Sequence, residues 1–114
     1  MIKIYGIKSC DTMKKAFRWL DEHKIEYVFH DYKKQDLEES TASAWVEALG
    51  WENVINKRGT TWRKLDDETK NSMDAKQAVQ VMLAQTSIIK RPLIVAGETK
   101  LLGFNPDEYT EHLL

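Results

Sequence analysis

The sequence predicts an α/β fold, a mixed β-sheet in the order βαβ…ββα with an all-helical insertion between the second and third strands. Three observations support this prediction. Apolar and polar residues alternate over residues 1–5 and 25–30, on either side of a segment with helical spacing. An apolar run over 92–96 is followed by a two-residue turn signal and by residues 99–102, which return as its antiparallel partner. The middle of the chain, 36–90, carries helical patterns.

The first strand, helix and second strand form a βαβ unit. After Gly6, apolar residues recur at helical spacing, at Met13, Ala16, Phe17 and Leu20. We expect this helix to begin at residue 11 or 12 and to end at 23 or 24, with Asp11 or Ser9 as its N-cap. The two flanking strands are expected to be parallel, because a strand–helix–strand connection of this length makes a right-handed crossover. His30 is placed on a polar face of the second strand.

The insertion is predicted to contain a helix capped by Asp36 and ended by Gly50. The apolar residues of that helix are Leu37, Trp45, Ala48 and Leu49. Residues 51–61 are expected to be irregular. A short helical turn over 62–65 and a longer helix over about 74–85 follow.

The end of the chain returns to strands. Pro92 opens the third strand, where its missing N–H removes no central ladder bond. Asn105 followed by Pro106 is typical of a helix start, and this last helix is expected to run through Leu113. Because no linker, repeat or low-complexity segment interrupts the pattern, residues 1–114 are predicted to form one domain.

Composition excludes several classes of protein. Among 114 residues, 42% are hydrophobic and 31% charged, and the net charge of −1 offers nucleic acid or a membrane surface no electrostatic attraction. No apolar run approaches the roughly 18 residues of a membrane span, and the N-terminus lacks the apolar stretch of a signal peptide. A single cysteine forms no internal disulfide, so we expect a reducing, cytoplasmic environment. One cysteine and three scattered histidines show no metal-ligand spacing, which predicts no metal site.

That cysteine, Cys10, lies where the first strand gives way to the first helix. A thiolate at a helix N-terminus faces unpaired N–H groups and the positive end of the helix dipole, and both favour the ionised, nucleophilic form. The nearby lysines Lys8, Lys14 and Lys15 add positive charge. The alternative is that Cys10 is a small buried hydrophobic residue, as many single cysteines are.

The element order, the cysteine after the first strand and the proline that opens the third are together those of a thioredoxin-like fold. In folds of this class the proline packs beside the active sulfur and its preceding peptide bond is cis. The resemblance therefore implies a cis bond between Arg91 and Pro92.

Short motifs along the whole chain resemble the YffB-like branch of the arsenate reductase (ArsC) family, to which the Spx regulators are related. In chain order these motifs are residues 5–16, 30–32, 48–51, 56–62 and 90–94. The family has a thioredoxin-like fold, in which a cysteine attacks an oxyanion or a disulfide and glutathione completes the cycle.

The resemblance implies roles for individual residues. Cys10 matches the catalytic cysteine, Thr12 a hydroxyl residue of its loop, and Lys14 a position that arsenate reductases fill with arginine. Arg58 and Arg91 match two arginines that bind the anion. A guanidinium suits that role because it is permanently charged and presents a planar fork to carboxylates and oxyanions. The alternative for Arg58 is a solvated loop charge.

These matches imply a glutathione-dependent thiol–disulfide reductase with Cys10 as its nucleophile and with Arg58, Arg91, Thr12, Lys14 and Pro92 as substrate- or glutathione-binding residues. Glutathione is expected as a cosubstrate, with no bound cofactor. The expected substrate is a small disulfide or oxyanion, and the protein is expected to be a monomer.

Departures from the family pattern define the alternatives. Arsenate reductases have a histidine where this chain has Gly6, and a third arginine after the last strand, where residues 102–106 contain none. Spx regulators carry a Cys-x-x-Cys switch, and Met13 replaces its second cysteine here. An arsenate reductase and an Spx-like regulator that binds RNA polymerase stay open as alternatives. A Cys-x5-Arg phosphatase is disfavoured, because Ala16 stands where the arginine is required.

Overall fold

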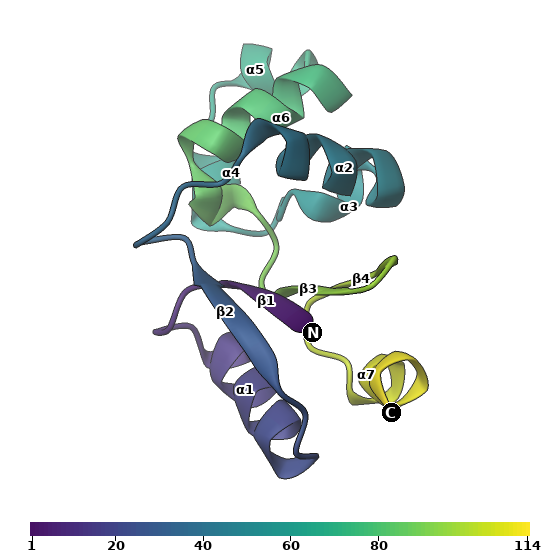
Figure 1. The fold of residues 1–114 in the computed structure, drawn as a ribbon. Coiled ribbons are helices and arrows are strands. Elements are labelled where there is room, and N and C mark those ends of the chain that lie inside the picture. Colours follow the sequence, from purple (N-terminus) through teal and green to yellow (C-terminus); the bar gives the residue numbers. More distant parts are fainter. The chain divides into compact units, whose positions relative to one another are not determined.

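The computed structural model describes residues 1–114, and the chain divides into two compact units (Figure 1). The first unit combines the two ends of the chain, Met1–Gln35 and Arg91–Leu114. The second unit, Asp36–Lys90, has the same bounds as the expected helical insertion. The first is referred to below as the sheet unit and the second as the helical unit.

The sheet unit contains four strands and two long helices. In chain order these are β1 Ile2–Gly6, α1 Asp11–Glu22, β2 Tyr27–Asp31, β3 Leu93–Ala96, β4 Thr99–Leu102 and α7 Pro106–Leu113. The strands lie in the order β2-β1-β3-β4. β1 pairs with β2 in parallel, with Tyr5 opposite His30, whereas β3 is antiparallel to both β1 and β4. The predicted fold class, a thioredoxin-like mixed sheet with a helical insertion, is confirmed.

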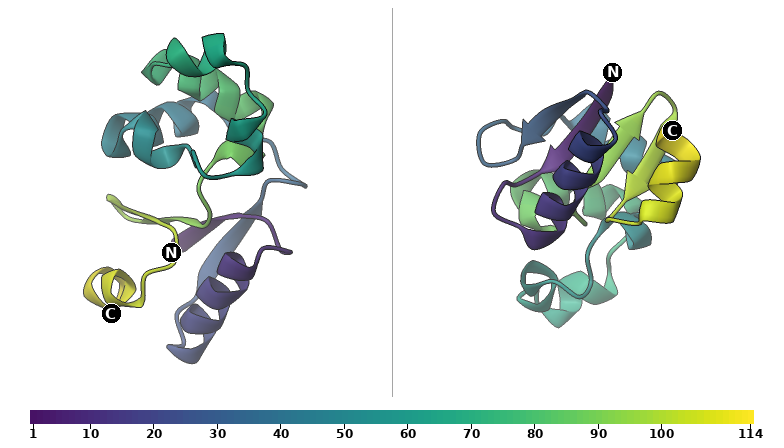
Figure 2. Two further views of the ribbon diagram at one scale, coloured as in Figure 1. Left: turned by 180° about the vertical axis from the view of Figure 1, so that it is seen from behind. Right: turned by 90° about the horizontal axis from the view of Figure 1, so that it is seen from below.

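Both long helices cover the same face of the sheet (Figure 2). The helical periodicity of α1 places Met13, Ala16 and Leu20 in the core, and all three are fully buried. They pack with residues of β1, β3, β4 and α7, namely Ile4, Ile94, Leu101 and Tyr109. This packing fixes the start of α1 against the sheet.

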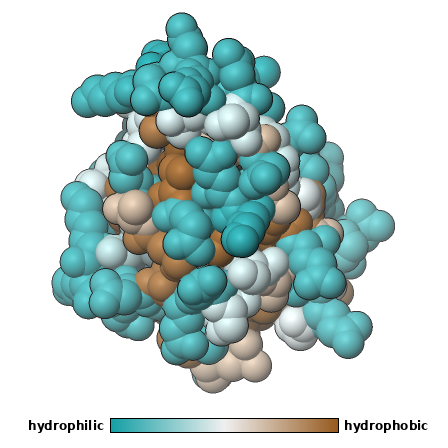
Figure 3. All heavy atoms as spheres, turned by 90° about the horizontal axis from the view of Figure 1, so that it is seen from above, coloured by the Kyte–Doolittle hydropathy of each residue, from teal (hydrophilic) through white to brown (hydrophobic).

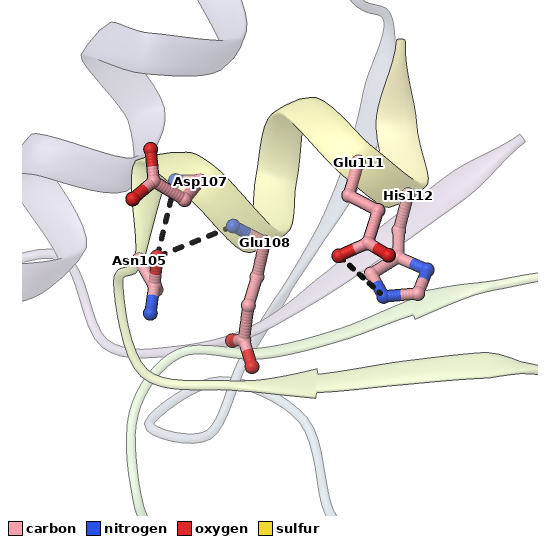
Figure 4. Close-up of polar contacts among 5 residues, drawn as sticks. All are labelled: Asn105, Asp107, Glu108, Glu111 and His112. Atoms are coloured by element: carbon pink, nitrogen blue, oxygen red, sulfur yellow. Dashed lines mark hydrogen bonds and ion pairs between the residues drawn. The ribbon is translucent and has the colours of Figure 1, made fainter.

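The C-terminal helix α7 begins at the predicted cap. Asn105 Oδ1 accepts hydrogen bonds from the backbone N–H groups of Asp107 at 3.0 Å and Glu108 at 3.2 Å (Figure 4). The Tyr109 hydroxyl donates to the Gly103 carbonyl at 2.7 Å and ties the helix to the preceding turn. The segment that carries a third arginine in arsenate reductases is therefore a structured connection in this chain.

The helical unit contains α2 Glu39–Leu49, α3 Trp51–Val54, α4 Thr60–Arg63, α5 Asp67–Asn71, α6 Ala75–Ala84 and the 3₁₀ helix η1 Thr86–Ile88. Its core forms where α2 packs on α6, through Ala42, Trp45, Val46, Ala78, Val79 and Met82. Hydrogen bonds of 2.8 Å from Asn56 N–H to the Ile88 carbonyl and from Lys90 N–H to the Val54 carbonyl close the unit.

Two predictions for this unit are wrong. Glu38, with an extended backbone, is the N-cap of α2 in place of Asp36, and Leu37 is buried outside the helix. Residues 51–61 are not irregular, because they contain α3 and the start of α4, and α5 was not foreseen. Each of these helices has four or five residues, too few for a hydrophobic period to be visible in the sequence.

Figure 3 shows hydrophilic side chains over a large part of one face, with hydrophobic residues visible between them. The large hydrophobic side chains that are exposed are Met1, Val28 and Leu114. None of the helices has the length and apolar character that a membrane span requires.

Candidate active site

Cys10 is the N-cap residue of α1, with an extended backbone at φ −95° and ψ 132°. Neither Asp11 nor Ser9 caps the helix as predicted, because the first helical residue is Asp11 itself and the chain turns at Cys10. The Cys10 carbonyl accepts the first helical hydrogen bond from Lys14 N–H at 3.0 Å. The thiol is partly exposed, so a substrate has access to it.

Several groups set the acidity of the Cys10 thiol. Burial, the largest single influence, raises its pKa, whereas hydrogen bonds from the backbone N–H groups of Met13 and Thr12 and the charge of Arg91 lower it. The lowering effects prevail, so the pKa of Cys10 lies below its ordinary value. Increased thiolate character makes the sulfur a better nucleophile near neutral pH.

The cation that assists Cys10 is Arg91, and not the neighbouring lysines that the sequence suggested. The Arg91 guanidinium acts on the sulfur both through its charge and through a hydrogen bond. Lys8, Lys14 and Lys15 have exposed side chains, where water screens their charge. The sheet unit therefore brings together two residues from opposite ends of the chain.

Pro92 directly follows Arg91 in the chain and is buried. The peptide bond between Arg91 and Pro92 is cis, as the thioredoxin-like resemblance implied. The Pro92 carbonyl accepts a hydrogen bond from Gly103 N–H at 2.8 Å. The backbone N–H of Thr12 donates a hydrogen bond to the Cys10 sulfur, so Thr12 belongs to the same site. The Lys14 side chain points into solvent, so its binding role stays a prediction.

Arg58 belongs to the helical unit and lies in the turn before α4. Its N–H donates to Asn56 Oδ1 at 3.2 Å, and its carbonyl accepts from Arg63 Nη2 at 2.8 Å. The side chain is exposed and lines a hollow of about 320 Å³. The other lining residues are Glu52, Asn53, Ile55, Asn56, Lys57 and Lys90. A role for Arg58 at Cys10 stays a prediction.

Gly6 and Met13, two of the positions at which this chain departs from the family patterns, are in contact. A Cβ atom on Gly6 would lie 2.6 Å from Met13 Cε and closer still to Sδ. Met13 is fully buried in the core of the sheet unit. Any side chain at position 6 therefore requires the flexible end of the Met13 side chain to shift.

An aromatic group beside the site was not foreseen. The ring of His30 lies 4.9 Å from that of Tyr5 and 5.9 Å from that of Tyr32. Its expected place on a polar face is wrong, because His30 is half-buried and its Nε2 atom is out of contact with water. The alternation along β2 does not reveal the neighbouring rings that enclose His30.

The structure has no group of three or more histidine, cysteine, aspartate or glutamate side chains arranged to hold a metal ion. The groups gathered at the site are the Cys10 thiol, the backbone N–H groups of Thr12 and Met13, and the Arg91 guanidinium. Together these groups form a nucleophile next to a fixed positive charge. Such a pair attacks an electrophilic sulfur or an oxyanion and binds negative charge on the same substrate.

The sheet order and the cysteine at the N-cap of α1 define a thioredoxin-like fold with one partly exposed thiol. The chain belongs to the ArsC family, whose sequence profile matches residues 5–112. This confirms the family resemblance inferred from the motifs.

Individual relatives agree with this assignment. The structure of the YFFB (PA3664) protein is 48% identical, each chain covers 100% of the other, and the TM-score is 0.96. An arsenate reductase (ArsC) related protein from Brucella melitensis is 44% identical over 98% of this chain and 93% of that one, with a TM-score of 0.79. The global transcriptional regulator Spx of Streptococcus pneumoniae is 26% identical over 95% of this chain and 82% of its own length.

Proposed function

We propose that this protein is a glutathione-dependent thiol–disulfide reductase that acts through Cys10. The observation that supports this proposal best is the position of the Cys10 sulfur, at the N-terminus of α1 and hydrogen-bonded by Arg91. That position favours the thiolate and holds a cation beside it for an acidic substrate.

The proposed reaction has two exchange steps. The Cys10 thiolate attacks one sulfur of a disulfide, the S–S bond breaks, and the departing thiolate takes a proton from solvent. Because the chain has one cysteine, a second thiol has to come from outside. A glutathione thiolate then attacks the mixed disulfide, releases the Cys10 thiolate and carries the other half away as a new disulfide. The electrons for the reduction come from glutathione.

The arginines and the backbone N–H groups have separate parts in this proposal. The N–H groups of Met13 and Thr12 stabilise the thiolate before attack and after release. Arg91 binds a carboxylate of glutathione next to the reacting sulfur. Arg58 supplies a further charge for the same cosubstrate, as the family pattern implies.

Two observations favour an alternative function, the reduction of arsenate. The name of the Brucella melitensis relative refers to arsenate reductase, and the same thiolate and Arg91 suit attack on arsenate. However, Gly6 replaces the family's histidine, and residues 102–106 supply no third arginine.

A regulatory role that relies on binding a protein is the third possibility, from the likeness to Spx.

The test is incubation of the protein with glutathione disulfide, followed by mass spectrometry of the intact chain. We expect one glutathionyl group on Cys10, which added glutathione removes, and no adduct on a Cys10→Ser variant. A turnover assay with a small disulfide and glutathione then measures the complete cycle. Failure of the wild-type protein to form an adduct, combined with stoichiometric capture of RNA polymerase, would favour the regulatory alternative.

A further inference from the structure

The hollow of about 320 Å³ in the helical unit gathers three cationic side chains. All of its lining residues belong to that unit, and none of the groups that set the pKa of Cys10 is among them. The cations are Lys57, Arg58 and Lys90, and Glu52 is the one carboxylate that lines the hollow with them. A concave surface with an excess of one sign of charge concentrates the electric field. The hollow therefore favours a ligand with more than one negative charge.

Two segments far apart in the sequence bring these cations together. Ile55 and Ile89 form an isolated β-bridge, and both side chains are almost fully buried. Two backbone hydrogen bonds of 2.8 Å flank the bridge, one donated by Asn56 N–H and the other by Lys90 N–H. The bridge thus joins the segment of Lys90 to the segment that leads into Lys57.

The neighbours of Lys57 hold its side chain in place. The ammonium lies 4.9 Å from the ring centroid of Trp51 and 5.7 Å from that of Trp62. It also lies 3.8 Å from Glu52 Oε2. The faces of indole rings attract a cation, and the carboxylate adds to that attraction. Because these contacts restrict a long side chain in advance, an anion that binds Lys57 costs it less conformational entropy.

The turn after Asn56 adds further donors. Arg58 N–H donates to Asn56 Oδ1 at 3.2 Å, so the amide of Asn56 keeps its NH₂ group as a donor at the hollow. The Arg58 guanidinium presents a planar fork that suits phosphate and carboxylate groups. Ile55 is the one apolar residue that lines the hollow, which gives an uncharged, apolar ligand little surface to contact.

We propose that this hollow binds a compact polyanion, that is, a small molecule with two or more phosphate or carboxylate groups. Three cations against one carboxylate leave an excess of two positive charges, which a ligand with a single negative charge does not neutralise. The volume equals that of roughly ten water molecules, which gives room for more than one anionic group. Since the lining side chains are largely exposed, salt should weaken the binding.

This inference is independent of the proposed function, because it involves no thiol chemistry. Arg58 is already assigned to glutathione there, so the experiment relies on the other charged residues of the hollow. Binding of inorganic diphosphate, for the phosphate class, and of citrate, for the carboxylate class, is measured by titration calorimetry at low ionic strength. The proteins are wild type and the variants Lys57→Met, Lys90→Met and Glu52→Gln.

Two matched controls change the same charges outside the hollow. Lys64→Met and Glu68→Gln replace exposed residues of the helical unit that do not line it. Methionine has nearly the length of lysine and packs well on aromatic rings, so Lys57→Met retains the packing on the indoles. Lys90 has no such ring contact, so its variant tests the site even if Lys57→Met disturbs the fold.

We expect Lys57→Met and Lys90→Met each to weaken binding about fivefold, as for the loss of one exposed charge pair. Glu52→Gln should tighten binding about threefold, because it removes the one negative charge of the hollow. A variant that simply unfolds cannot bind more tightly. The two controls should change the dissociation constant by less than about twofold. Binding of both probes supports a general polyanion site, whereas diphosphate alone or citrate alone assigns the ligand to one class.

Three results would overturn the proposal. One is the absence of binding of either probe at low ionic strength. Another is an equal effect of the variants of the hollow and their controls, which would indicate only a diffuse attraction to surface charge. The third is loss of binding in Arg91→Ala with no change in Lys57→Met, which would place the anion beside Cys10. Formation of the glutathione adduct on Cys10 tests the proposed function separately, so either proposal can fail alone.

Discussion

Arg91 and Arg58 match two arginines of one family pattern, but they lie in regions of different character. Arg91 is half-buried in the sheet unit, next to the buried Pro92, and hydrogen-bonds the Cys10 sulfur. Arg58 is exposed in a polar turn of the helical unit. The contrast shows that the sheet unit alone supplies the nucleophile, its N–H donors and one fixed cation.

The surroundings of Arg58 are more exposed to solvent than those of Arg91. Its neighbour Lys57 lies over the rings of Trp51, at 4.9 Å, and Trp62, at 5.7 Å, and pairs with Glu52 at 3.8 Å. These groups are exposed or half-exposed, so water screens the charge of the turn. We therefore expect the helical unit to contribute to binding more weakly than Arg91 does.

The largest expected effect concerns the choice of substrate. Arsenate is a compact anion whose reduction requires dense positive charge, and this chain lacks the family's histidine and third arginine. If each missing group supplied ~2 kcal/mol of transition-state stabilisation, the joint deficit would be on the order of a thousandfold in rate. Arsenate reduction should therefore equal the Cys10→Ser blank, while the same preparation reacts with glutathione disulfide. Robust arsenate turnover would reverse the ranking of the two functions.

The second-largest expected effect is on the free energy of unfolding. It tests whether a loss of stability in the helical unit leaves the pKa of Cys10 unchanged. Trp45 is almost fully buried in the helical unit, and its truncation to alanine should lower the free energy of unfolding by about 3–5 kcal/mol. Leu20→Ala in the sheet unit should cost about 2–5 kcal/mol. Urea unfolding measures both losses. Under native conditions the Cys10 pKa of Trp45→Ala should stay at the wild-type value, because the groups that set it belong to the sheet unit.

The third effect separates the two arginines directly. Arg91→Ala should weaken glutathione or oxyanion binding by about 1.5–3 kcal/mol, tenfold or more in affinity, and raise the Cys10 pKa. Arg91→Lys should rescue binding only in part, because the planar fork is lost. Arg58→Ala should weaken binding less and leave the pKa unchanged. Equal losses from both alanine variants would contradict the contrast, and no loss from either would place the binding site elsewhere.

The sequence predicted the parts of this molecule that depend on periodicity. The alternation in residues 1–5 and the spacing of Met13, Ala16 and Leu20 located β1 and α1, because both patterns extend over several residues. The short helices α3 and α5 went unseen for the opposite reason. The helix α1 begins at Asp11, within the predicted start at residue 11 or 12, but the N-cap is Cys10 and not Asp11 or Ser9.

The site was only partly predictable, because some of its properties arise from tertiary packing. Cys10 followed from its place between a strand and a helix. Its interaction with Arg91 was visible only through the family pattern, since the two residues lie far apart in the sequence. The rings that enclose His30 and the contact of Gly6 with Met13 depend on how the chain packs around them, and no local pattern signals either.

The smallest effect is the dependence of stability on pH. The pKa of Cys10 is lower in the folded protein than its ordinary value, so folding favours the thiolate. Below the folded pKa the thiol is protonated in both states and contributes nothing. Stability gained from the thiolate increases as the pH rises through the folded pKa, and is complete above the unfolded value of about 8.5. The stability of wild type relative to Cys10→Ser should therefore increase with pH across that window.

Two measurements check this expectation. Urea unfolding of both proteins at several pH values gives the difference in stability, and thiolate absorbance gives the Cys10 pKa of the folded protein. Arg91→Ala should reduce the pH-dependent gain, whereas Arg58→Ala should retain it, because only Arg91 acts on the sulfur within the sheet unit. A relative stability that falls as the pH rises would mean that burial outweighs the N–H groups and Arg91. Cys10 would then be a buried thiol and not a nucleophile.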